Sequence, residues 1–130
     1  MNKKIVFIVS SCGIIAMIIG SLVLLLILSY PKKLFKEYIA SPIPPSVRIL
    51  RANKRGGTFD NSVNIRFRVN KNDLKSILKN KRFFKVKNYS GKTPKWFKCS
   101  EVYQLSGNNS VSYIFVDKTQ TYAEFLYLNY

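Results

Sequence analysis

The sequence contains no histidine, and only two of its 130 residues are cysteine. Without histidine the chain lacks the commonest general base and metal ligand, and no Ser-His or Cys-His nucleophile pair can form. Cys99 is the only cysteine outside an apolar N-terminal run, so the folded part cannot form an internal disulfide. We therefore predict no metal and no cofactor, and a domain that its hydrophobic core alone stabilises.

Acidic residues are also scarce. Hydrolases that use paired carboxylates need two acids close together, whereas the six acids here are scattered along the chain. We interpret Asp73 as a helix-start residue and Asp117 as a turn residue, and expect Glu101 and Glu124 to pair with Lys or Arg across a sheet. We therefore predict that the protein is not an enzyme. The alternative is an enzyme of unusual type that uses Cys99 or a carboxylate.

Charge is absent from residues 5–29, and 16 of these 25 residues are Val, Ile, Leu or Phe. Those side chains favour membrane insertion by about 5 to 10 kcal/mol. A helix of this length measures roughly 37 Å, against a hydrocarbon core of about 30 Å. Tyr30 suits the membrane interface, and Pro31 disfavours helical geometry at the residue before it, so we expect the helix to end there.

A cleaved signal peptide is the alternative to an uncleaved anchor. Its apolar core usually runs about 7 to 15 residues and ends at small residues, whereas the run here is longer and has no small-x-small site before Pro31. Residues 9–12 resemble a lipobox, which would make Cys12 a lipidation site; the simpler interpretation is an ordinary residue of a membrane helix. Cys12, Ala16 and Gly20 recur every four residues, a spacing that permits helix–helix association in membranes and that chance also explains.

The remaining residues carry 20 Lys and Arg against six Asp and Glu, a net charge of +14. Such a domain is attracted to anionic surfaces, and beside a membrane the nearest one is the lipid headgroup layer, at about 1 kcal/mol per nearby basic residue. An acidic protein partner is the other candidate. The opposing interpretation is a solvated surface that reflects a Lys- and Asn-rich composition. We expect no nucleic-acid partner, because the aromatic–basic interleaving of nucleic-acid modules is missing.

Three parts follow from these patterns. Residues 1–30 form the signal-anchor transmembrane helix, residues 31–45 a juxtamembrane helix and Pro-rich spacer, and residues 46–130 a small basic domain. Basic residues flank the apolar run on both sides, so their distribution does not fix orientation; a short basic N-terminus before one apolar helix usually stays inside. We therefore place the C-terminal domain outside the cytoplasm.

The domain is predicted to be α+β. Residues 47–51 are strand-like, residues 53–58 with two glycines form a turn, and residues 62–69 alternate apolar with polar as in a strand with one dry face. A helix follows, capped by Asn70 or Asn72, and then three or four strands, of which residues 111–116 and 121–128 form a hairpin. The expected architecture is a mainly antiparallel sheet with one helix packed on it.

Six basic residues come from the two adjacent N-terminal strands and their turn, and we predict that several share one face as a binding surface: Arg48, Arg51, Lys54, Arg55, Arg66 and Arg68. An aromatic pair, Trp96 and Phe97, lies between two lysines. It can insert at a membrane interface or stack on a ligand, or close the core beneath its loop, which is the interpretation we favour.

The chain also resembles a group of small bacterial envelope proteins of uncharacterised function, which are lipoproteins or single-pass anchored proteins. The resemblance covers most of residues 44–128, from a Pro-Pro-Ser start to a closing Tyr-rich strand, with these positions between: Val47, Asp60, Arg66-Phe67, Asp73-Leu74, Ile77-Leu78, Trp96-Phe97, Tyr103 and Phe115-Val116-Asp117. It implies an extracytoplasmic bacterial domain and no catalytic residue; the chain departs from the lipidated members in its lipobox.

Together these features favour a non-enzymatic protein of the bacterial inner membrane with one span. Its basic extracytoplasmic domain would bind anionic lipid or an acidic protein partner. The alternative function is an immunity or superinfection-exclusion protein acting at the inner membrane.

Overall fold

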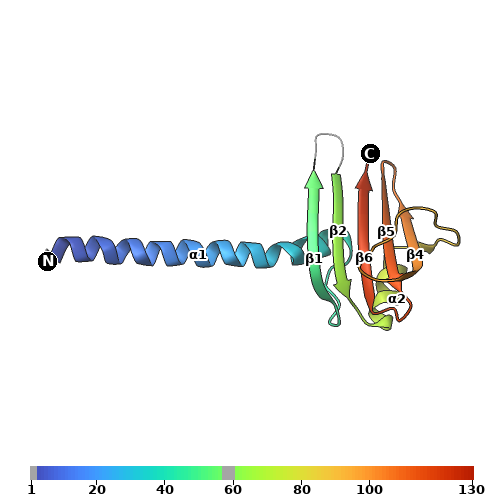
Figure 1. The fold of residues 1–130 in the computed structure, drawn as a ribbon, viewed down its shortest axis with the longest axis horizontal. Coiled ribbons are helices and arrows are strands. Elements are labelled where there is room, and N and C mark those ends of the chain that lie inside the picture. Colours follow the sequence, from blue (N-terminus) through green and yellow to red (C-terminus); the bar gives the residue numbers. More distant parts are fainter. Residues whose placement is uncertain (1–2, 57–60) are drawn as a thin grey trace. The chain divides into compact units, whose positions relative to one another are not determined.

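The structure is a computed structural model that describes residues 3–56 and 61–130, with side chains from Gly13 onward. The chain divides into two compact units, Met1–Tyr30 and Pro31–Tyr130. Within the described residues, two helices and six strands follow one another in this order (Figure 1): α1 (Lys3–Tyr38), β1 (Arg48–Gly56), β2 (Asn61–Arg68), α2 (Lys71–Asn80), β3 (Phe84–Lys85), β4 (Cys99–Ser106), β5 (Ser110–Asp117) and β6 (Tyr122–Asn129).

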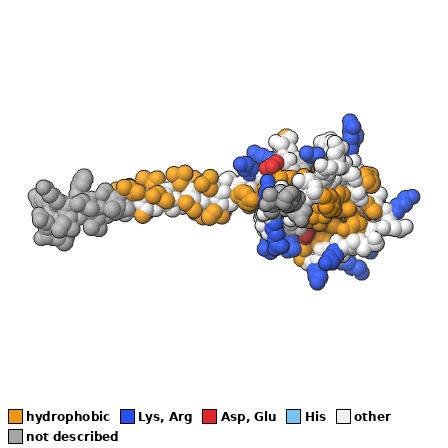
Figure 2. All heavy atoms as spheres, turned by 90° about the horizontal axis from the view of Figure 1, so that it is seen from above, with side chains coloured by type: hydrophobic (Ala, Val, Ile, Leu, Met, Phe, Trp, Pro, Cys, Tyr) orange, Lys and Arg blue, Asp and Glu red, His pale blue; other side chains and the backbone are white. Residues whose placement is uncertain are grey.

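The first unit contains α1 up to Tyr30, and the last residues of this helix belong to the second unit. The stretch Gly13–Tyr38 of α1 is long and apolar enough to cross a membrane, with a mean hydropathy of 2.5. Large apolar side chains from Ile14 to Leu28 are exposed all around the helix, and Figure 2 shows them covering its visible surface. A helix that is apolar on every side needs an apolar surrounding. Cys12 lies outside the described side chains, so its lipidation and its stripe with Ala16 and Gly20 stay predictions.

The prediction that the helix ends at Pro31 is wrong, because α1 continues through Pro31 to Tyr38. Proline removes one backbone hydrogen bond from a helix and disfavours helical geometry before it. The turns that follow are stabilised by packing instead: Leu34 and Phe35 are completely buried in the second unit.

The second unit contains a six-stranded antiparallel sheet in the order β1-β2-β6-β5-β4-β3. It also contains the helix α2, which lies between β2 and β3 in the sequence. This confirms the predicted α+β class. Strands β4, β5 and β6 form two consecutive hairpins through short turns, and the second is the hairpin that the sequence predicted. β6 lies between β5 and β2. The pairing of β2 with β6 therefore joins two strands that are far apart in the sequence.

The core lies on one face of the sheet, which we call the inner face. The predicted alternation of β2 is confirmed, with Val63, Ile65 and Phe67 completely buried on that face. The apolar side of α2 packs against them, as does the end of α1, where the rings of Phe35 and Phe67 meet edge to face at 5.1 Å. A buried ring pair of this kind contributes about 0.5–1.5 kcal/mol beyond its area.

The segment 31–45 therefore belongs to the compact unit, whereas the sequence suggested a helix and spacer outside the domain. Ile39 is completely buried, and Pro42 to Pro45 line a hollow together with α2. An amphipathic pattern in a juxtamembrane segment fits a membrane surface and a protein core equally well. Here the apolar side chains of the segment pack in the protein core.

Capping holds α2 in place. Asn70 is the N-cap, its side chain accepting from the backbone N–H of Asp73, and the Asp73 carboxylate accepts from the hydroxyl of Ser46 at 2.6 Å. At the other end Arg82 adopts φ 59°, and the N–H groups of Arg82 and Phe83 donate to the carbonyls of Lys79 and Leu78. This is a Schellman ending with arginine where glycine is usual.

The turn predicted at residues 53–58 is wrong in its first part, because β1 continues through residues 53–55 to Gly56. Residues 57 and 58 lie outside the described residues.

Candidate anion-binding face

The opposite face of the sheet, the outer face, gathers arginines on β1 and β2. In the antiparallel register Arg48 pairs with Arg68, and Arg51 pairs with Arg66. Arg55 pairs with Ser62 on the same face. We call these five arginines the arginine face; it contains five of the six basic residues that the sequence grouped together.

A β-bulge brings the arginines of β1 onto one face. The register shifts between Ile49 and Arg51, so Leu50 is an extra residue in β1. Without it, strict alternation would put Arg48 and Arg51 on opposite faces. The bulge therefore sets both of them beside the arginines of β2.

Lys54 does not belong to this face, which corrects the sequence prediction. It pairs with Val63, whose side chain points into the core, and its ammonium lies 5.6 Å from the ring centre of Tyr38. Adjacent residues of a strand point to opposite faces, so Lys54 and Arg55 cannot share one.

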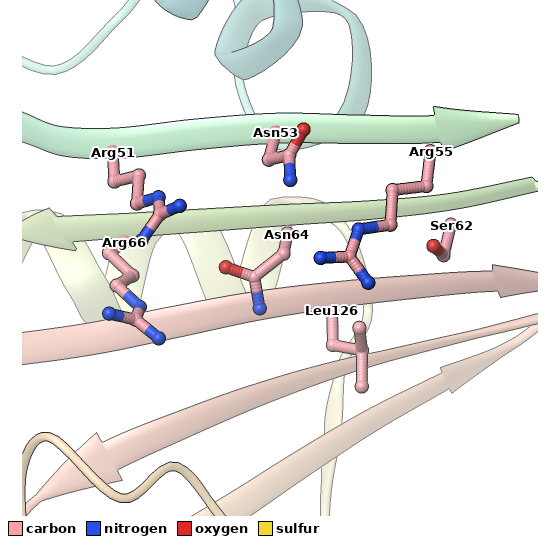
Figure 3. Close-up of a pocket in the computed structure, with 7 residues that line it drawn as sticks. All are labelled: Arg51, Asn53, Arg55, Ser62, Asn64, Arg66 and Leu126. Carbon is pink, nitrogen blue, oxygen red and sulfur yellow. The ribbon is translucent and has the colours of Figure 1, made fainter.

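A groove of about 320 Å³ lies on the outer face. Figure 3 shows guanidinium and amide groups from β1 and β2 on the same side of the sheet. The lining residues are Arg51, Asn53, Arg55, Ser62, Asn64, Arg66 and Leu126. Guanidinium and amide N–H groups are donors that suit carboxylates and phosphates. The sequence did not single out the two asparagines, Ser62 or Leu126.

A second hollow, of about 420 Å³, continues the arginine face toward the start of α2. Arg48 and Arg68 line it together with Lys71. Three cations at one opening reinforce the electrostatic preference for an anion.

The two arginines of β2 have partners on β6. Arg66 lies opposite Glu124, with its Nε 3.1 Å from Oε2 of that carboxylate. Arg68 lies opposite Tyr122, with its guanidinium 5.0 Å from the ring centre. The expectation that Glu124 pairs across the sheet is thus confirmed. Among the described carboxylates, none lies within ion-pair distance of Arg48, Arg51 or Arg55.

Glu124 is the centre of a buried polar network. Its side chain is 9% exposed, and it accepts from Asn64 Nδ2 at 2.5 Å, from Arg66 and from the indole N–H of Trp96. Three donors converge on its two oxygens, so the carboxylate holds three neighbouring side chains in place.

Trp96 and Phe97 are half-buried on the outer face. The Trp96 ring contacts Phe97 at 4.6 Å and Tyr122 at 5.7 Å, and Arg66 lies 5.3 Å from its centre. Tyr89, from the same long loop, packs on Tyr113 and Phe115. The loop thus covers the outer face over β5 and β6 and reaches Arg66 of β2, while the arginines of β1 stay exposed.

Two other acids of the sheet, Glu101 and Asp117, have structural partners. Glu101 accepts from Lys85 at 2.5 Å and from Tyr103 at 2.8 Å. The Lys85 and Tyr103 hydrogen bonds hold the pKa of Glu101 below its usual range, while burial and Glu101 raise the pKa of Tyr103 to about 12. Asp117 accepts backbone N–H groups of the β5–β6 turn.

Cys99 is half-buried, and burial raises the pKa of its thiol. The thiolate, which is the reactive form, is thereby disfavoured. In the part of the chain that the structure describes, no cluster of three His, Cys, Asp or Glu could hold a metal ion.

The chain matches no family model, no curated protein and no solved structure. The chemistry of the arginine face therefore has to be inferred from its own geometry. That geometry offers hydrogen-bond donors and positive charge.

Proposed function

We propose that this protein is a non-enzymatic, membrane-anchored binding protein of the bacterial envelope, whose arginine face binds anionic lipid or an acidic protein partner. The observation that carries the proposal is the β1–β2 register, which sets Arg48 opposite Arg68 and Arg51 opposite Arg66. Like charges directly opposite destabilise a sheet, and of these four arginines only Arg66 has a described carboxylate within ion-pair distance, that of Glu124. An anion bound beside Arg48, Arg51 and Arg68 would reduce that cost.

Side-chain chemistry supports the same ligand class. Arginine presents a planar fork of donors that binds carboxylate and phosphate in a bidentate way. Asn53 and Asn64 add neutral donors to the groove. Figure 2 shows Lys and Arg side chains projecting on several sides of the second unit with few acids between them, so the field around the domain attracts anions generally.

The non-enzymatic part of the proposal rests on what the polar groups do. The sequence has no histidine, and Glu124 and Glu101 are engaged by partners that hold the sheet and its covering loop. The helix α1 supports the membrane-anchored part. We place it in the inner membrane, crossing once, with the domain outside the cytoplasm.

The proposal can be tested with the full chain in nanodiscs of zwitterionic lipid. Vesicles that contain phosphatidylglycerol and soluble polyglutamate serve as the two anionic probes, and Trp96, the single tryptophan, reports binding by its fluorescence. We expect at least one probe to bind, and to bind more weakly as salt rises.

The variant Arg48→Gln/Arg51→Gln/Arg55→Gln should bind that probe about tenfold more weakly, since each exposed ion pair contributes roughly 0.2–1 kcal/mol. A matched control removes three charges elsewhere, with Lys75→Gln, Lys79→Gln and Lys98→Gln, all exposed. Equal weakening in both triple variants would show that only net charge matters. Absence of binding to either probe would contradict the proposal.

A further inference from the structure

β1 is an edge strand. It begins the sheet order, and in the described part of the chain β2 is the only strand beside it. Its nine residues extend about 30 Å at the usual rise per residue. An open strand edge presents a row of backbone donors and acceptors that can pair with another chain.

The arginines of β2 show how a neighbouring strand provides side-chain partners for an arginine. Each lies directly opposite a residue of β6 that partners it, Glu124 for Arg66 and Tyr122 for Arg68. The arginines of β1 occupy equivalent positions one strand further out, where no described strand follows. A strand on the open edge of β1 would place its side chains opposite them in the same way.

We propose that β1 binds an extended acidic segment of a partner protein as an added strand. This inference rests on the proposed function and commits it to an acidic protein. The carboxylates of the segment would occupy alternate positions, about 7 Å apart along the strand. They would face Arg48, Arg51, Asn53 and Arg55, which lie on the same face of β1.

The intervening positions of the added strand face the other side of the sheet. There Ile49 and Ala52 of β1 are half-buried against the core. Uncharged or apolar side chains suit that side, so the expected ligand alternates acids with β-branched residues.

A second copy of this chain is a poor occupant of the same edge. Charged side chains on an edge strand discourage self-association, and β1 has three arginines and a lysine. Two such strands side by side would juxtapose like charges. The same charges favour an acidic strand, so the edge selects its partner by charge.

The test uses the full chain in neutral detergent and a fluorescently labelled peptide of about ten residues in which Glu alternates with Thr. Binding is followed by fluorescence anisotropy, and hydrogen exchange is measured by mass spectrometry on the peptides that cover β1. We expect the peptide to bind and the amides of residues 48–56 to exchange more slowly when it is bound, because pairing engages the backbone of the edge.

Two controls separate strand addition from attraction between charges. A peptide of the same sequence with N-methyl groups on alternate backbone nitrogens keeps every carboxylate but cannot form one row of strand hydrogen bonds. Two such peptides, methylated on opposite rows, cover both registers, and at least one should bind tenfold more weakly or worse. The variant Arg51→Gln/Arg55→Gln should lose about tenfold, while Lys75→Gln/Lys79→Gln on α2 should change affinity by less than about threefold.

The outcomes distinguish this inference from the function it rests on. If both methylated peptides bind as the parent does and hydrogen exchange in β1 is unchanged, strand addition is overturned. If the arginine variant still loses binding in that case, the proposal that the arginine face binds anions is supported. Binding of phosphatidylglycerol vesicles without peptide binding would likewise overturn the acidic-segment proposal and support a lipid ligand. If neither probe binds, both proposals fail. Far-UV circular dichroism of each variant confirms that it is folded.

Discussion

The buried carboxylate of Glu124 offers the sharpest test of how the arginine face is built. Asn64, Arg66 and Trp96 all donate to it, so one substitution disturbs three neighbours. We consider two changes. Glu124→Gln removes the charge and keeps the shape, while Glu124→Ala removes every acceptor.

The two variants should differ in magnitude. In Glu124→Gln the remaining oxygen can accept from Arg66 and Trp96, and Asn64 can turn its amide to accept from the new NH₂ group. The loss is then mainly of charge assistance, about 1–2 kcal/mol. Glu124→Ala leaves the donors of Asn64 and Trp96 without an acceptor and opens a small void, which should cost about 2–4 kcal/mol. The Arg66 side chain is 34% exposed, so water reduces its share.

Urea denaturation of the full chain in neutral detergent measures these differences, with Trp96 fluorescence as the signal. Trp96 should also change its emission in the folded state of both variants, because its indole N–H loses a carboxylate. Glu37→Gln, at an exposed acid of the same unit, is the matched control and should change stability by less than about 0.5 kcal/mol. If Glu124→Ala were as mild as this control and left the emission unchanged, the network would have no role in holding the loop on the sheet.

Three further predictions use the same measurement. Phe35→Ala should destabilise the second unit by about 3–5 kcal/mol, because this completely buried ring packs on Phe67; a cost under 1 kcal/mol would place it outside the core. Arg82→Gly should stabilise by about 0.5–1 kcal/mol, because arginine is strained at φ 59° and glycine is not. Glu101→Gln should destabilise more at pH 7 than at pH 3. The native pKa of Glu101 lies below its ordinary 4.5, so its contribution is complete above pH 4.5 and disappears as the pH falls through the native pKa; equal effects at both pH values would contradict this assignment.

Local signals in the sequence predicted much of the fold. The alternation in β2 gives its buried face directly, and the cap at Asn70 with the apolar face of α2 gives the helix. The hairpins β4–β5 and β5–β6 follow from short polar turns between β-branched runs. Each of these features depends on residues close in sequence, where periodicity and turn chemistry are informative.

The site was only partly predictable, because its geometry depends on register. The bulge at Leu50 changes which side chains of β1 share a face, and no residue there signals it. The Arg66–Glu124 pair joins residues 58 apart in sequence, since β6 inserts beside β2. Without knowledge of that topology, nothing in the sequence distinguishes Glu124 from the other acidic residues in predicted strands. The burial of Leu34 and Phe35 was missed for a similar reason, because the sheet they cover comes later in the chain.

The dependence on salt distinguishes an arginine face that binds an anion from one that is only solvated. Added salt should raise the stability of the ligand-free domain and lower the affinity for an anionic ligand. The two arginines within each facing pair, Arg48↔Arg68 and Arg51↔Arg66, repel each other, the second pair less strongly because Glu124 lies beside Arg66. Added salt screens that repulsion over about 10 Å at 0.1 M. The ligand-free domain should therefore become more stable as salt rises, and Arg51→Gln should reduce this dependence by relieving one pair. The same salt should weaken the attraction of an anionic ligand for the face. Ligand-induced stabilisation, which reaches about 2.7 kcal/mol at a hundred times the Kd, should shrink accordingly. A domain whose stability ignored both salt and Arg51→Gln would have no uncompensated charge on this face, and the reason to expect an anion there would be gone.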